Sequence, residues 1–156
     1  MDPNIKKIRS IANYQFGQGT GEAIFTDDVS ISYSKNTGRI RHVSQENTLL
    51  ATLKPNDGKF TLTIAGAKKI IANKENFAYY VKVNTESAEA VSQGRNVFAK
   101  HVLDQGEVIR PSDEVIVLDE NGSVVGVGKS ILTKKEAAAF KIGVAVKVRR
   151  GSESDA

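Results

Sequence analysis

Two segments of the chain combine glycine, apolar residues and cations, which are the residue types that contact a phosphate backbone. Residues 94–103 and residues 143–150 each begin with a glycine and continue as an apolar, strand-like run. Glycine lets the backbone approach a ligand closely, and open N–H groups and cations bind phosphate oxygens. The two segments therefore predict a phosphate-binding surface. Its candidate residues are Gly94, Arg95, Asn96, Lys100, Lys147, Arg149 and Arg150.

The pattern alone leaves an ordinary structural explanation open for both segments. Gly94 could simply end a helix and leave two solvated side chains after it, and local pattern favours this explanation. In residues 143–150, three valines alternate with Ala145, Lys147 and Arg149, as in a half-buried strand with cations on its outer face. Such cations also protect an edge strand from pairing with another chain. The pattern does not decide between that role and phosphate binding.

Phe98 is the aromatic residue of the first segment and invites comparison with a base-stacking platform. We expect it in the core instead. In a regular strand Phe98 and Lys100 would share one face, so a bulge or a helix–strand junction would have to separate a buried Phe98 from an exposed Lys100.

Three blocks of the C-terminal half resemble the PUA domain, a small RNA-binding pseudo-barrel found at the ends of many RNA-modifying enzymes. They are residues 94–100, 109–117 and 143–151. The resemblance implies that the junction at Gly94 contacts the acceptor end of tRNA or a related stem. It also places Arg95 and Lys100 on the same side as the cations of the last strand, which favours RNA binding over the structural explanations.

The N-terminal half is similar to the domain that precedes PUA in the archaeal tRNA-guanine transglycosylase family, which makes archaeosine. The matching blocks are residues 11–17, 38–43 and 50–62. The implied fold is an α+β N-terminal domain, with a helix and an antiparallel four-stranded sheet, followed by a mostly-β PUA pseudo-barrel. We expect domains at residues 1–74 and 77–151 and a flexible tail at 152–156.

The apolar periodicity and the turn residues predict the elements of both domains. Asp2 and Pro3 are expected to start a helix that stops by Gly17, and residues 18–21 to form a loop. The remaining first-domain elements are strands at 29–34, 39–43, 48–53 and 60–64 and a helix at 65–73. The second domain has expected strands at 79–83, 97–103, 114–119, 124–130 and 144–151, with helices at 87–93 and 133–140.

The net charge of +4 is modest, and its distribution is more informative than its size. Residues 1–76 hold 11 Lys and Arg against 7 Asp and Glu, whereas residues 77–156 hold 11 of each. The second domain must therefore separate its charges in space if it binds RNA. A second surface is suggested by Arg39, Arg41 and His42, together with Lys6, Lys7 and Arg9, although an ordinary basic exterior explains these residues equally well.

Several classes of site lack the residues they need. The chain has no cysteine, and its two histidines, His42 and His101, are far apart in sequence, so no zinc site and no cofactor is expected. Residues 18–23 lack the Gly-Lys-Ser/Thr of a phosphate loop. No run approaches the roughly 20 apolar residues of a membrane span, and the N-terminus does not resemble a signal peptide, which favours a cytoplasmic protein.

These observations predict a non-catalytic RNA-binding protein that contacts the acceptor stem and 3′ end of tRNA and is linked to tRNA modification of the archaeosine type. The chain is too short for a catalytic barrel of about 250 residues, and it lacks the zinc cysteines of the related enzyme. One alternative is a protein-interaction subunit of a split RNA-modifying enzyme, which exposed apolar residues in the first domain would favour. A small enzyme that uses Asp27, Asp28 or His42 has little support.

Overall fold

The computed structural model describes residues 2–140 and 142–153. The chain divides into two compact domains, Met1–Phe77 and Ala78–Ala156, and residues 154–156 of the expected tail lie outside the described residues. The first domain contains α1 (Ile5–Phe16), α2 (Thr20–Ile24), β1 (Ser30–Tyr33), β2 (Ile40–Gln45), β3 (Thr48–Leu53), β4 (Phe60–Leu62) and α3 (Ile64–Asn73).

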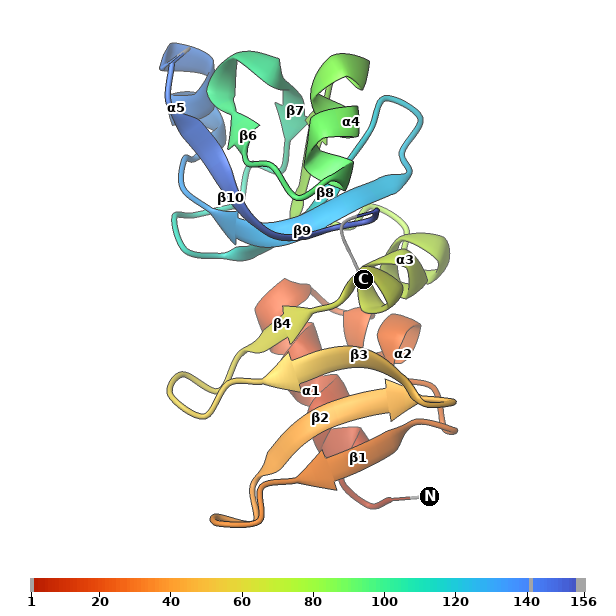
Figure 1. Ribbon diagram of the computed structural model, residues 1–156. Coiled ribbons are helices and arrows are strands. Elements are labelled where there is room, and N and C mark those ends of the chain that lie inside the picture. Colours follow the sequence, from red (N-terminus) through yellow and green to blue (C-terminus); the bar gives the residue numbers. More distant parts are fainter. Residues whose placement is uncertain (1, 141, 154–156) are drawn as a thin grey trace. The chain divides into compact units, whose positions relative to one another are not determined.

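The first domain is an antiparallel meander with helices on one side of the sheet (Figure 1). The strands follow the order β1-β2-β3-β4. Val43, Ala51 and Leu62 are register neighbours on three adjacent strands, and all three are buried. The apolar face of α1 contributes Ile5 and Phe16 to the same core. Burial of one sheet face against one helix face explains why this part of the sequence alternates.

The start of the first domain differs from the sequence expectation in two places. The cap position of α1 is Asn4 rather than Asp2, whose carboxylate instead accepts a hydrogen bond from the Asn4 N–H at 2.8 Å. The expected loop at 18–21 contains the first residues of α2. Asn13 Oδ1 accepts hydrogen bonds from the N–H groups of Gly19 and Gly21, which fixes this short helix against α1. Five residues are too few for periodicity to reveal a helix.

The second domain is a nearly closed barrel of six strands. Its elements are β5 (Tyr80–Val83), α4 (Thr85–Ser92), β6 (Val97–Phe98), the 3₁₀ helix η1 (Ala99–His101), β7 (Val102–Gln105), β8 (Glu114–Leu118), β9 (Val124–Ser130), α5 (Lys134–Ala139) and β10 (Val144–Gly151). The strand order is β6-β10-β9-β8-β5-β7. Only the β5–β8 pair is parallel among the described pairs. Valines from most of these strands fill the core.

The expected strand at 97–103 is two strands on opposite edges of the sheet. Residues 97–98 pair with β10 and residues 102–105 pair with β5, and η1 carries the chain between the two edges. The expectation that Phe98 lies in the core is wrong. Phe98 is 45% exposed, whereas its neighbour Val97 is fully buried. Adjacent residues of a strand face opposite sides, so only one of the two can enter the barrel.

Several local predictions agree with the structure. The predicted strands at 48–53 and 124–130 have those bounds in the structure as β3 and β9. Helix α5 lies within the expected helix at 133–140, and Thr133 and Glu136 form a capping box at its start. Helix α4, however, begins at Thr85 with Asn84 as its cap, two residues before the expected start at 87.

Candidate nucleic-acid interface

Gly94 ends helix α4 in the left-handed conformation, with φ of 94°. Its N–H donates to the Val91 carbonyl at 2.8 Å, and the Arg95 N–H donates to the Ala90 carbonyl at 3.1 Å. These two bonds form the motif that satisfies the last carbonyls of a helix. The expectation that this junction offers open amides is therefore wrong. Gly94 is needed here because a left-handed helix end disfavours residues with a Cβ.

Asn96 holds the neighbouring strand in place instead of projecting freely. Its side-chain oxygen accepts a hydrogen bond from the Val148 N–H at 2.9 Å. This bond fixes the segment that carries Arg95 beside the C-terminal half of β10. Arg95 is exposed at this position.

This contact gives a direct prediction for two adjacent residues. We expect Asn96→Ala to lower the free energy of unfolding by about 1 kcal/mol, because the Val148 amide loses its partner. Arg95→Ala should leave stability nearly unchanged, since no side-chain hydrogen bond of Arg95 is seen in the described structure. Urea unfolding of both variants measures the difference. Equal stability of the two would contradict a positioning role for Asn96.

Strand β10 departs from strict alternation. Ala145 is buried at 1% exposure, although it was expected on the outer face with Lys147 and Arg149. Register shifts interrupt the pairing of β10 between Val144 and Val146 and again near Arg149. Irregularities of this kind re-aim side chains. Lys147 and Arg149 remain exposed, as predicted.

Arg149 is engaged in a partly buried ion pair with Glu114 of strand β8. Arg149 Nη1 donates to Glu114 Oε1 at 2.9 Å, and Nη2 donates to Oε2. Glu114 is only 7% exposed. A bidentate pair to a buried carboxylate stabilises the sheet and orients the guanidinium. Arg149 therefore links β10 to β8, and its charge is largely compensated by Glu114 instead of being available to a phosphate.

Two lysines face each other directly across strands β9 and β10. Lys147 is the register partner of Lys129, and both side chains are exposed. Neither belongs to an ion pair within residues 2–140 and 142–153. Like charges directly opposite each other on a sheet are destabilising, and a bound anion would relieve their repulsion. We refer to Lys129 and Lys147 as the lysine pair.

Sequence reasoning missed Lys129. It is the one cation within residues 124–130, so the strand pattern could have indicated an outward position for it. The strand pattern could not indicate which residue of β10 lies opposite Lys129. The register between β9 and β10 joins residues 18 positions apart, and bulges on β10 shift that register.

The predicted cations are spread along strand β10 and the segments beside it rather than gathered in a compact cluster. Lys100 belongs to η1, where the Ala99 N–H donates to the Gly143 carbonyl at the start of β10. Arg95 lies beside Val148 near the other end. At about 3.3 Å per residue, Gly143 and Val148 are roughly 17 Å apart. A surface of this length suits an extended backbone better than a single phosphate.

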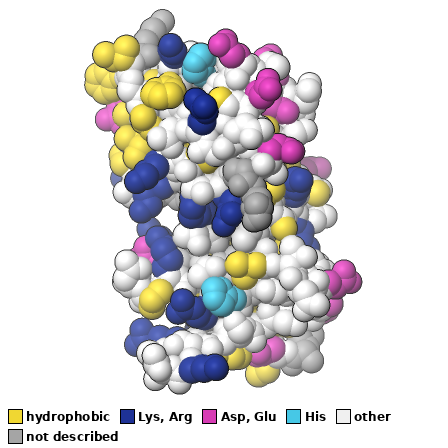
Figure 2. Space-filling view, viewed as in Figure 1, with side chains coloured by type: hydrophobic (Ala, Val, Ile, Leu, Met, Phe, Trp, Pro, Cys, Tyr) yellow, Lys and Arg dark blue, Asp and Glu magenta, His cyan; other side chains and the backbone are white. Residues whose placement is uncertain are grey.

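Glu114, the register partner of Lys129 on β8, is bound to Arg149, and other acidic side chains of the second domain are used in local contacts elsewhere. Figure 2 shows Lys and Arg gathered over β9 and β10, and Asp and Glu over α4. Glu120 Oε2 accepts a hydrogen bond from the Thr85 N–H at the start of α4. Tyr80 donates to Asp104 Oδ2 at 2.6 Å, and this bond raises the pKa of Tyr80 to about 12. The balanced domain thus separates its charges in space.

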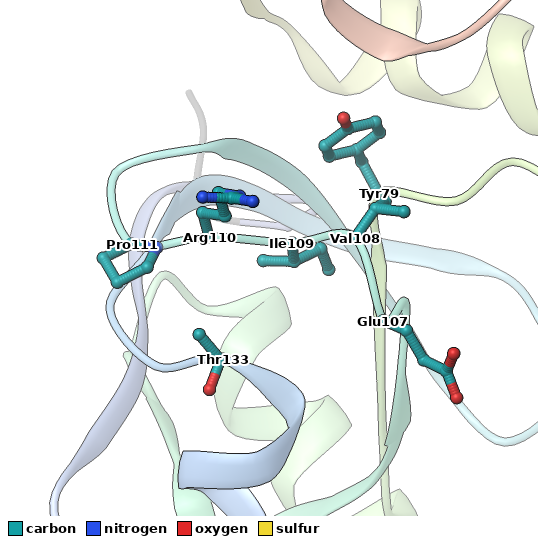
Figure 3. A pocket seen from close by; sticks show the side chains of 7 residues that line it. All are labelled: Tyr79, Glu107, Val108, Ile109, Arg110, Pro111 and Thr133. Carbon is teal, nitrogen blue, oxygen red and sulfur yellow. The ribbon is translucent and has the colours of Figure 1, made fainter.

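A shallow pocket lies in the loop region before β8 (Figure 3). It is lined by Tyr79, Glu107, Val108, Ile109, Arg110, Pro111 and Thr133. Burial and the nearby Asp113 raise the pKa of Tyr79, so its phenol stays neutral at physiological pH. Glu107 points away from Tyr79 and Arg110 in Figure 3. The pocket offers an aromatic ring and a cation but no pair of groups for acid–base chemistry.

The second group of candidate residues lies on strand β2 and the turn before it. Arg39 and Arg41 are exposed, and His42 is half-buried. Arg41 Nε donates to His42 Nε2 at 3.2 Å, and His42 Nδ1 lies 3.2 Å from Thr52 Oγ1. Arg41 and Thr52 thus hold the His42 ring from its two nitrogens and fix its orientation on the sheet.

Within the described residues, no group of three or more His, Asp or Glu side chains could hold a metal ion. No described helix has both the length and the apolar character needed to cross a membrane.

Comparison with known families assigns both domains. Residues 79–152 match the PUA domain, and residues 6–76 match the patch-forming domain C2 of tRNA-guanine transglycosylase. The chain contains a PUA domain preceded by a C2 domain. Its PUA domain is the six-stranded barrel that carries the lysine pair, and the C2 domain is the helix-and-meander unit before it. Both parts of the predicted fold are confirmed.

The curated relatives of this PUA-domain protein are archaeal enzymes that are much longer. It is 44% identical to tRNA-guanine(15) transglycosylase of Thermoplasma volcanium over 98% of this chain, which is 24% of that enzyme. It is 38% identical to the enzyme of the same name from Methanothermobacter thermautotrophicus over 95% of this chain and 23% of that enzyme. The chain therefore spans about a quarter of these relatives and resembles their C-terminal part.

Two solved structures share the whole fold at low sequence identity. A hypothetical protein from Pyrococcus horikoshii aligns with a TM-score of 0.74 and 17% identity, over 96% of this chain and 90% of that one. A PUA domain protein from Thermoplasma acidophilum aligns with a TM-score of 0.69 and 16% identity, over 94% and 87% of the two chains. The same pairing of domains thus occurs in chains of similar length.

Proposed function

We propose that this protein is a non-catalytic RNA-binding module that contacts the acceptor stem and 3′ end of tRNA. The observation that carries the proposal is the lysine pair, two adjacent cations that form no ion pair among the described residues, on the outer face of a PUA domain. Arg95 and Lys100 extend this positive surface along β10. We place the protein in a tRNA-modification pathway of the archaeosine type because its relatives are named tRNA-guanine(15) transglycosylases.

The mechanism is recognition of backbone and shape. The major groove of an RNA helix is too deep and narrow for side chains to read, so proteins contact its phosphates, its 2′-hydroxyls and its single-stranded ends. A rigid barrel holds the cations at fixed spacing, which reduces the entropy lost on binding. The bond from Asn96 and the ion pair of Arg149 supply that rigidity at β10.

Binding to intact and trimmed tRNA tests the proposal. We expect the protein to bind tRNA with an affinity that falls steeply as salt rises, and to bind less tightly after the unpaired 3′ nucleotides are removed. Fluorescence anisotropy at several salt concentrations measures both effects. Equal affinity for the two RNAs would reject contact with the 3′ end, and no binding at low salt would reject RNA binding altogether.

A role as the docking subunit of a split RNA-modifying enzyme is the second candidate function. It is favoured by exposed apolar side chains, which include Tyr14 and Tyr33 in the first domain and a larger group in the PUA domain. Phe98, Phe140 and Ile142 are 45%, 54% and 86% exposed, and hydrophobic side chains gather over α5 and β6 in Figure 2. Stable co-purification with a catalytic protein, without RNA affinity of its own, would favour this role over direct tRNA binding.

A further inference from the structure

Two turns of the C2 domain carry related sequences to the same end of the sheet. They are Ser34-Lys-Asn-Thr-Gly-Arg39 and Lys54-Pro-Asn-Asp-Gly-Lys59. Each connects a pair of antiparallel strands, β1 to β2 and β3 to β4. In a meander the first and third turns project from one end, as Figure 1 shows. We call these segments the hairpin tips.

The first hairpin tip has a closed turn that presents a cation directly after a glycine. Ser34 N donates to the Arg39 carbonyl at 2.8 Å, and Gly38 N donates to the Ser34 carbonyl at 2.8 Å. Gly38 has φ of 71°, and Thr37 Oγ1 accepts from the Arg39 N–H at 3.3 Å.

The second hairpin tip repeats this arrangement. Lys54 N donates to the Lys59 carbonyl at 2.9 Å, and Gly58 N donates to the Lys54 carbonyl at 3.0 Å. Gly58 has φ of 68°, and Asp57 Oδ1 accepts from the Lys59 N–H at 2.9 Å. Two segments 20 positions apart thus place a cation in the same position of the same turn.

The end of the sheet that these turns form is strongly positive. Its cations are Lys35, Arg39, Arg41, Lys54 and Lys59. The single acid in these two turns is Asp57, and Lys54 occupies it in an ion pair at 2.9 Å. Arg39 and Lys59 are exposed and enter no ion pair among the described residues. Apart from the adjoining residues, no atom lies within 4 Å of a Cβ placed on Gly38 or Gly58, so the backbone of both turns is open to a ligand.

We propose that the two hairpin tips form a second RNA-binding surface that grips a phosphate backbone through Arg39 and Lys59. The inference extends the proposed RNA binding from the PUA domain to the C2 domain and rests on that function. Adjacent strands lie about 4.8 Å apart, and the two turns are two strand positions apart. Their cations are therefore offset by about 10 Å and contact different phosphates. The tips carry no aromatic ring, so they position the RNA without reading its bases.

The composition of the tips favours RNA over an anionic membrane. A protein that lies on a membrane also buries apolar or aromatic side chains in the lipid. The two turns contain only Ser, Thr, Asn, Asp, Gly, Pro, Lys and Arg. Exposed cations on polar turns match the oxygen-rich surface of a nucleic-acid backbone.

The double variant Arg39→Glu/Lys59→Glu in the full chain tests this surface. We expect its affinity for tRNA at about 0.1 M salt to fall by 10-fold or more, with the slope of log affinity against log salt reduced by about two. The matched control is Lys68→Glu/Lys135→Glu, which makes the same charge change on exposed helix positions. Hydroxyl-radical footprinting should show lost protection of a limited set of riboses with the tip variant alone.

The outcomes separate this inference from the function on which it rests. If the wild-type protein binds tRNA and the tip variant keeps the same affinity and salt slope, the second surface is rejected and PUA-domain binding stands. An equal loss in tip and control variants also rejects it, because net charge then explains the effect. Absence of RNA binding by the wild type rejects both proposals. If the tip variant loses only the binding of an acidic protein, the assignment to RNA is wrong.

Discussion

Replacing both members of the lysine pair by glutamate is expected to weaken tRNA binding roughly 100-fold at about 0.1 M salt. Each lysine that contacts a phosphate displaces about one counterion, and charge reversal adds repulsion to the lost attraction. Lys129 and Lys147 lie opposite each other, so both contacts fall on the same stretch of backbone. Fluorescence anisotropy of Lys129→Glu/Lys147→Glu over a salt series measures the loss.

The control for this experiment is again Lys68→Glu/Lys135→Glu, whose affinity should fall only slightly. Removing the repulsion between the two lysines should leave the fold intact, so circular dichroism of Lys129→Ala/Lys147→Ala should match the wild type. Wild-type affinity in the glutamate variant would show that the outer face of β9 and β10 does not contact RNA. The proposed function would then depend on another surface of the PUA domain.

Substitution of Gly128 by alanine is expected to cost the PUA domain about 3 kcal/mol of stability. Gly128 lies on β9 directly opposite Val148, with the chain of β10 packed against its Cα. A Cβ at this position would lie 2.8 Å from Val148 Cα and closer still to the Lys147 carbonyl oxygen. These are backbone atoms, so the clash cannot be relieved by rotating a side chain, and β9 and β10 would have to separate.

Hydrogen exchange gives the most local measurement of this effect. Amide protection should fall in β9 and β10 of Gly128→Ala, and the urea midpoint of the PUA domain should decrease. Gly122→Asn is a suitable control, because Gly122 has φ of 82° and a Cβ added there would meet open space. Asparagine tolerates the left-handed conformation, so this variant should remain close to wild type. Unchanged protection in Gly128→Ala would contradict this prediction, because it would mean that β9 and β10 accommodate the added methyl group without separating.

Turn residues and alternation were enough to predict most elements of both domains. Asn-Gly and Asp-Gly pairs marked hairpins, and the valines of residues 124–130 marked a buried strand with the correct bounds. Residues 97–103 were misassigned because a two-residue strand and a three-residue 3₁₀ helix are shorter than the windows in which periodicity is visible. The same error placed Phe98 in the core.

The amino-acid sequence by itself determined the order of the domains, their family resemblance, most strands and turns, and the presence of cations on the last strand. The tertiary structure decided which of those cations are neighbours. In the folded chain Arg149 is paired with Glu114, and Asn96 accepts a hydrogen bond from β10. The amides after α4 donate to carbonyls of that helix, and Lys129 lies beside Lys147. Local conformation depends on residues close in sequence, whereas charge pairing across a sheet depends on the register of distant strands, which packing and bulges fix only in the folded chain.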